Sequence, residues 1–255
     1  MNPFFIISPL EQFEVNSLLS FNAPIFGYFN FTLTNLALYS ILIFILILSL
    51  HYMGNNDIKL LPSKWSIALE SLFSSIHSIV REQIGTSNEI YLPFIYSLFC
   101  FILVANLVGN IPFSFAITSS AIVCLGLSFT IFIAVTILGL YTHKITFFSF
   151  FLPVGTPVYL VPMLVLIETI SYLARAVSLG VRLFANIVAG HSLLKILSSF
   201  LYNLFSTSFI FFIVSLIPFT LFIMLVGLEL IVSFIQAYVF CLLVSSYLKD
   251  VIELH

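Results

Sequence analysis

The stretch SLGVRLFANIVAGH, Ser178–His191, lies inside an apolar run that extends from Val158 to Leu201. A second apolar run, Phe209–Lys249, follows after the short polar segment YNLFSTS. A helix of about 40 residues is ~60 Å long, twice the ~30 Å hydrocarbon core of a bilayer. Neither run contains a cluster of polar turn residues. We therefore expect two long, strongly tilted membrane helices that form a hairpin over residues 158–249, with Tyr202–Ser208 as the connection.

The composition of the whole chain is that of an integral membrane protein. Of its 255 residues, 61% are hydrophobic and only 7% are charged, whereas an ordinary soluble protein carries roughly 25% charged residues. The apolar runs are too long for barrel strands, so the spans are helical. The three cysteines lie in apolar runs, which indicates buried thiols and neither a disulfide framework nor a metal site. The net charge of -2 does not suggest nucleic-acid binding, and no hydrophilic segment is long enough for a soluble catalytic domain.

The first half of the chain predicts three further spans and one surface helix. Residues 32–53 form an apolar segment of about 20 residues, which is enough to cross a bilayer. Residues 65–84 combine apolar and polar side chains at helical spacing, which is typical of an amphipathic helix on the membrane surface. Residues 90–141 form a two-span hairpin. The fold class is therefore an all-α integral membrane protein, with residues 1–255 in a single membrane domain.

Charged residues in the connecting segments predict the orientation. If the early segments cross as described, four basic residues fall on one side of the membrane: Lys59, Lys64, Arg81 and Lys144. The leading segment, with Glu11 and Glu14, falls on the other side. By the positive-inside rule, the basic side faces the inner compartment.

Ionisable residues inside the two long runs form a pattern. A charge at the bilayer centre costs at least ~2.5–3.5 kcal/mol on insertion scales, so a sequence keeps one where it faces a polar cavity or a partner charge. Lys195 lies nearer one end, and the deeper ionisable residues are Glu168, Arg175, Arg182, His191 and Glu229. The first three are seven residues apart in turn, so they share one helix face. Asn186 follows Arg182 by four residues, and Gln236 continues the face of Glu229.

Small residues accompany this polar stripe on the first long helix. They are Ala174, Ser178, Gly180, Ala185, Ala189 and Gly190. Small side chains allow another helix to approach closely. The pattern therefore combines a polar stripe, a fixed cation and room for a neighbouring helix.

Each polar residue also has a purely structural interpretation. Glu168 and Arg175 are compatible with a static buried salt bridge, and Gln236 with a hydrogen bond inside the bundle. A lone buried histidine is usually satisfied by a hydrogen bond, but Glu229 gives His191 a second titratable group nearby. Arg182 has no carboxylate within its own helical turn or the next, which favours a functional role.

Four segments resemble one protein family. ETISYLARAVSLGVRLFANIVAGH (168–191) strongly resembles the signature helix of subunit a (subunit 6) of F-type ATP synthases, and LELIVSFIQAYVFCLLVSSYLKD (228–250) resembles that family's last helix. SPLEQFEV (8–15) and ANLVGNIPFSFA (105–116) look like its N-terminal and third-helix motifs. The resemblance covers nearly the whole chain and is closest to fungal mitochondrial versions.

This resemblance implies roles for the residues already singled out. Arg182 matches the family's essential arginine, and Glu168 matches the acid that lines the proton exit path. Polar positions of the proton entrance path match Asn186, His191, Glu229 and Gln236. The implied location is the mitochondrial inner membrane. Because mitochondrial relatives often begin at SPL, Met1–Ile7 is expected to be removed.

The resemblance implies a proton-channel stator subunit of the membrane sector, without catalytic activity of its own and without a cofactor. The implied partners are the c-subunit ring, other stator subunits including subunit b, the lipid bilayer and protons, but not nucleic acid. Arginine stays protonated, so Arg182 can hold a fixed charge but cannot relay a proton. It favours the ionised form of a passing ring carboxyl, whereas lipid favours the protonated form. One cation can thus separate two aqueous half-channels.

Two other classes remain open from the residues alone. A self-contained proton or ion transporter would be expected to show inverted repeats and paired broken helices, and the sequence has no detectable repeat. A purely structural membrane subunit would not need ionisable groups at mid-membrane.

We also expect His191 and Glu229 to face each other across the hairpin and share the proton entrance. For antiparallel helices to bring them level, the hairpin midpoint must lie near residue 210. A tight turn at residues 202–208 would offset the pair by about ten residues, or ~15 Å. The connection is therefore expected to be longer than the polar segment, with Pro218 ending a short irregular or helical segment before the main helix.

Overall fold

The computed structural model describes residues 10–22, 30–54, 62–112, 114–152, 158–207 and 209–252. Within them, five helices are long and apolar enough to cross a membrane. They are α1 (Asn35–Gly54), α3 (Leu92–Gly109), α4 (Ala121–His143), α5 (Val161–Thr207) and α7 (Leu216–Ile252). This confirms the predicted all-α membrane fold. The expected removal of residues 1–7 concerns a segment outside the described residues.

Helix α2 (Lys64–Ile84) is amphipathic, as predicted. Its start is capped by Ser63, whose side chain accepts a hydrogen bond from the backbone N–H of Ser66 at 3.2 Å. Its buried residues belong to the same apolar core as α3, α4 and α7; they are Ile76, Ile79, Val80 and Ile84. The apolar face of α2 therefore packs on the protein itself.

A small β-hairpin precedes α1 and was not predicted from the sequence. Strands β1 (Ser17–Asn22) and β2 (Asn30–Thr34) pair antiparallel, and the backbone N–H of Asn35 extends the contact by donating to the carbonyl of Asn16 at 3.1 Å. The two strands are only six and five residues long. The long apolar segment of α1 follows directly, so the sequence pattern around residue 30 was interpreted as the start of a membrane span. The hairpin ties the N-terminal segment, including η1 (Glu11–Phe13), to the start of α1.

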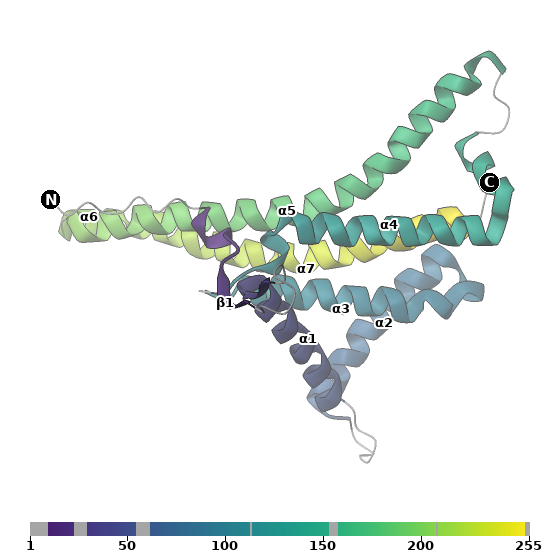
Figure 1. Cartoon of the computed structure of the whole chain (residues 1–255). Coiled ribbons are helices and arrows are strands. Elements are labelled where there is room, and N and C mark those ends of the chain that lie inside the picture. Colours follow the sequence, from purple (N-terminus) through teal and green to yellow (C-terminus); the bar gives the residue numbers. More distant parts are fainter. Residues whose placement is uncertain are drawn as a thin grey trace.

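The long helices pack against one another in one group. Helix α4 contacts α5, α3 lies along α7, and α5 and α7 also contact each other. Figure 1 shows that the first part of α5 diverges from α4. Gly180 on α5 lets α4 approach closely, because an added Cβ would lie 2.6 Å from Ser128 Oγ and 2.9 Å from the carbonyl oxygen of Cys124. All three cysteines are buried and free, so the prediction of buried thiols is confirmed. Short 3-10 segments connect the helices: η2 (Thr86–Tyr91), η3 (Ile117–Ser119), η4 (Lys144–Phe151) and η5 (Val158–Leu160).

The hairpin of α5 and α7 turns later than the polar segment suggested. Helix α5 continues through residues 202–207, so the predicted connection at YNLFSTS is wrong. The short helix α6 (Phe209–Val214) and a turn at Ser215 precede α7. The prediction that Pro218 ends this segment is wrong: the segment ends at the turn at Ser215. Pro218 lies in the first turn of α7, where its missing N–H leaves no hydrogen bond unmade. The longer connection expected from the pairing of His191 and Glu229 is therefore present.

Candidate functional site

Helix α5 has a packed face and an exposed face. The packed face consists of Tyr172, Ala176, Leu179, Leu183 and Ile187. The exposed stripe consists of Ala174, Ser178, Arg182, Ala185 and Ala189. Two of the small residues expected in this stripe serve other contacts: Gly180 faces α4, and Gly190 faces Glu229. The remaining small residues leave space beside the cation for a neighbouring helix.

Arg182 is the isolated charge of this stripe. In the described part of the chain, no ion pair or hydrogen bond involves its side chain, which is exposed. It lies seven residues after Arg175 and nine before His191, or ~10 Å and ~14 Å along the helix axis. The guanidinium is therefore available to a charge outside this chain, with one ionisable group on either side.

His191 and Glu229 meet across the hairpin, as predicted. The distance between His191 Nε2 and Glu229 Oε1 is 3.5 Å, and the two side chains are 18% and 10% exposed. Gly190 makes room for this contact, because a Cβ there would lie 2.8 Å from Glu229 Oε1. Neither atom has a hydrogen-bond partner among the described residues. A small movement would bring the two atoms within the ~2.6–3.2 Å that proton transfer requires.

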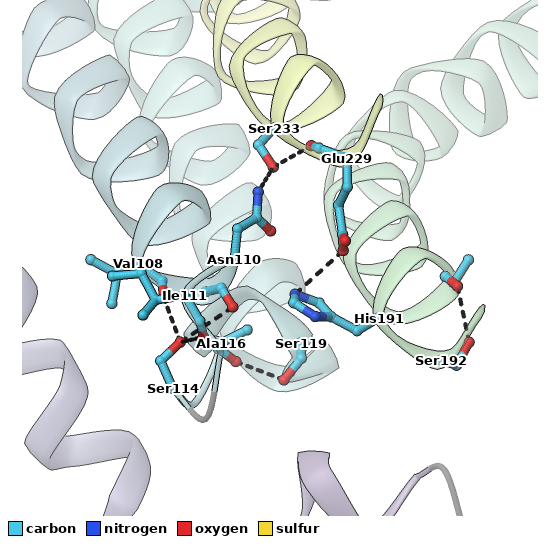
Figure 2. A network of polar contacts seen from close by, with 12 residues as sticks. Val108, Asn110, Ile111, Ser114, Ala116, Ser119, His191, Ser192, Glu229 and Ser233 are labelled. Carbon is cyan, nitrogen blue, oxygen red and sulfur yellow. Dashed lines mark hydrogen bonds and ion pairs between the residues drawn. The ribbon is translucent and has the colours of Figure 1, made fainter. Parts of the chain in front are cut away.

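A polar network continues from Glu229 toward α3 (Figure 2). The Ser233 hydroxyl donates to the backbone carbonyl of Glu229 at 2.8 Å, and Asn110 Nδ2 donates to Ser233 Oγ at 2.7 Å. Asn106, which is completely buried, donates from Nδ2 to the Ser233 carbonyl at 3.3 Å. The Oδ1 atoms of both asparagines have no hydrogen-bond partner among the described residues. Buried acceptors of this kind are suited to binding water.

Sequence reasoning quoted both asparagines within a motif but did not assign them to the site. The available signal was an asparagine in the interior of the apolar span α3, where an amide is costly unless it has a polar partner. Of the predicted entrance residues, Asn186 lines a cavity of about 240 Å³ together with Gly190 and Glu229. Gln236 is half-buried on α7, and no hydrogen bond joins it to another described residue. The structure therefore brings Asn186, but not Gln236, to the pair.

A second ionisable cluster lies nearer the start of α5. Arg175 Nη2 is 3.7 Å from Glu168 Oε1, and Arg175 Nη1 donates to Asp250 Oδ2 at 3.2 Å. The three side chains are each about one-third exposed, so the cluster is accessible. A cavity of about 10 Å³ beside it, lined by Tyr172 and Tyr247 among others, has room for about one water molecule.

The salt bridge that the sequence left open as an alternative for Glu168 and Arg175 is therefore present, but it is shared with Asp250. Sequence reasoning assigned Asp250 no role. Asp250 lies in the last turn of the second long helix. Because the two long helices run antiparallel, this turn lies at the level of Arg175, and the sequence could have indicated the contact for that reason. Arg175 thus has two carboxylate partners, in contrast to Arg182.

Comparison with known proteins gives a consistent result. Residues 37–249 match the ATP synthase A chain family. The chain is 63% identical over 252 residues to the ATP synthase subunit a of Mycosarcoma maydis, with 99% of each chain covered. It is 49% identical to the protein of the same name from Emericella nidulans and 45% identical to that from Kluyveromyces lactis, with 98% of each chain covered in both comparisons.

Proposed function

The chain belongs to the ATP synthase A chain family, and from this membership we propose that its long hairpin holds separate entrance and exit paths for protons on either side of Arg182. The protein is the proton-translocating subunit of the membrane sector and a multi-pass membrane component of the ATP synthase complex. The remaining question is how its residues pass protons through the bilayer without a leak.

The position of Arg182 carries the proposal. It is exposed on a stripe of small residues, with no charge partner in the described segments, whereas Arg175 on the same helix has two. A cation without a partner of its own is costly in a membrane. A carboxyl group on each subunit of a rotor ring that passes this stripe would supply the missing partner. The ring of c subunits is the partner that this geometry favours.

The entrance path runs past the polar network between α3, α5 and α7. The pair of His191 and Glu229, the adjoining cavity at Asn186, and the asparagine–serine hydrogen bonds supply polar groups in an otherwise apolar region. Each of these groups can hold water or a proton. A ring carboxylate that moves away from Arg182 receives its proton here, because the ionised form loses its stabilising cation.

The exit path runs past Glu168 and Asp250 on the other side of Arg182. When a protonated ring carboxyl returns to the cation, its ionised form is again favoured, and the proton is released toward these carboxylates. Arg182 keeps its own proton throughout, so it blocks direct transfer between the two paths. Net proton flow then requires rotation of the ring.

We further propose that the protein lies in the mitochondrial inner membrane, that it has no catalytic activity of its own, and that it contacts stator subunits including subunit b. The fungal relatives and the apolar helices support this assignment. The leading acidic segment would face the outer compartment and the basic connections the inner one, by the positive-inside rule.

Arg182→Ala tests the central part of the proposal. In the assembled complex, this variant should abolish ATP-driven proton pumping and allow passive proton leak through the membrane sector. Arg182→Lys should substitute poorly, because an ammonium is compact and can lose its charge in the membrane interior. The exposed neighbour Val181 offers the control Val181→Ala, which should pump normally. Normal ATP synthesis in Arg182→Ala would refute the gate, and proton flux in the absence of a ring would favour a self-contained transporter.

Exchange of His191 and Glu229 tests the entrance. If the two residues act as a pair, the double exchange should pump faster than either single exchange, because it restores one histidine and one carboxylate at the two facing positions. Equal damage in all three variants would mean that the two positions act independently.

A further inference from the structure

The short segment before the β-hairpin lies against α5 at the level of the proposed entrance. Figure 1 shows η1, which begins the described chain, beside α5. The contact is specific: the rings of Phe13 and His191 meet edge to face, with centroids 6.3 Å apart and an interplanar angle of 72°. This separation and angle are those of a favourable aromatic pair. A residue near the start of the chain therefore touches the histidine of the entrance.

The backbone around Phe13 is held in place by hydrogen bonds. The N–H of Phe13 donates to the carbonyl of Leu10 at 3.0 Å, and the N–H of Glu14 donates to that of Glu11 at 3.2 Å. The side chain of Asn35, the first residue of α1, donates to the carbonyl of Glu14 at 3.1 Å. The Phe13 ring is thus presented from a segment that is tied to the first span.

The imidazole of His191 needs such a contact. Its Nε2 atom lies 3.5 Å from Glu229 but has no hydrogen bond to a described residue. A histidine side chain can rotate about its terminal torsion, and this torsion is broad when no hydrogen bond selects an orientation. Phe13 also borders an open cavity of about 440 Å³, which Phe184 and Val188 line as well. Phe13 therefore contacts both His191 and this cavity.

We propose that Phe13 is a positioning residue, whose ring holds the imidazole of His191 in the orientation that faces Glu229. The inference rests on the proposed function, since it assigns His191 to the proton entrance. Phe13 takes no part in proton transfer itself. Its contribution is to increase the fraction of time during which His191 and Glu229 are in contact.

The test uses the complete, assembled ATP synthase in membrane vesicles, with ATP-driven proton pumping normalised to the amount of assembled complex. Phe13→Ala should lower the pumping rate by about twofold to tenfold, the range that corresponds to loss of one aromatic pair. Phe13→Tyr, which keeps the ring, should restore most of the rate. Val15→Ala, a truncation of an exposed residue two positions later in the chain, serves as the matched control and should pump normally.

A double-mutant comparison separates positioning from a general structural effect. In a His191→Gln background, Phe13→Ala should cause no further loss of the residual rate, because its target is absent. An equal loss in both backgrounds, a normal rate in Phe13→Ala alone, or failure of tyrosine to rescue would overturn the inference. A normal rate in His191→Gln alone would overturn the proposed entrance as well, so the two failures are distinguishable.

Discussion

Gly190→Ala is a sharp test of the contact between the two long helices. An alanine Cβ at this position would lie 2.8 Å from Glu229 Oε1 and 3.2 Å from Glu229 Cδ, whereas ordinary van der Waals contact begins at 3.4 Å. The difference of about 0.6 Å must come from movement of the Glu229 side chain, because both close atoms belong to it. The carboxylate would therefore leave its position 3.5 Å from His191.

We expect Gly190→Ala to lower the proton-pumping rate without destabilising the helix. A misplacement of about 1 Å at a reacting group can reduce a rate by ~100-fold, so a shift of this size should lower the proton-pumping rate by about tenfold. The helix itself should be slightly more stable, since alanine is favoured over glycine in a helix interior by up to ~1 kcal/mol. The combination of unchanged assembly and reduced pumping distinguishes displacement of Glu229 from misfolding.

ATP-driven acidification of vesicles, normalised to assembled complex, measures this effect. Gly227→Ala is the matched control on α7, because an added Cβ there meets nothing within 4 Å. The control should pump normally and gain the same helix stability. If Gly190→Ala pumps as fast as Gly227→Ala, the reasoning that the glycine makes room for a functional carboxylate is wrong.

Three further predictions concern packing and the exit path. Gly180→Ala should push α4 and α5 apart, since the added Cβ meets a backbone carbonyl of α4 at 2.9 Å; overpacking of this kind costs about 1–3 kcal/mol, measurable as a lower Tm of the complex. Tyr96→Phe removes the hydroxyl that donates to His51 Nε2 at 3.2 Å and should lower the free energy of unfolding by about 1 kcal/mol; an unchanged unfolding curve would contradict the hydrogen bond. Glu168→Gln should slow proton release without preventing assembly, because Arg175 keeps its other carboxylate; an unchanged rate of ATP synthesis and an unchanged pH dependence would leave Glu168 a structural role only.

Much of the architecture was predictable because it depends on local properties of the chain. The length and uniform hydrophobicity of the two last runs require helices longer than a bilayer is thick, wherever the other helices lie. The amphipathic spacing of residues 65–84 likewise belongs to one helix. The boundary at residues 202–208 was wrong because polar residues are compatible with a continuing helix, so composition alone did not locate the turn.

Part of the candidate site was also predictable, for an energetic reason. A charge inside an apolar run is costly in any fold, so Arg182, His191 and Glu229 were identifiable without knowledge of their surroundings. Their pairing across the hairpin was expected from their chemistry, and the helical rise then required a hairpin midpoint near residue 210, later than the polar segment at residues 202–208.

The sequence by itself thus determined the membrane helices, the long hairpin and the isolated cation. Only the tertiary structure decided which distant groups complete the site. Asn106 contacts the Ser233 backbone across 127 residues of chain, and Arg175 contacts Asp250 across 75. Phe13, close to the N-terminus, contacts His191 in the second half of the chain. No local periodicity reports such contacts, because they depend on how α3, α7 and the N-terminal segment pack around α5. Close van der Waals packing between helix faces, together with these interhelical polar contacts, brings the side chains together, because lipid is as apolar as the helix faces and supplies no hydrophobic driving force.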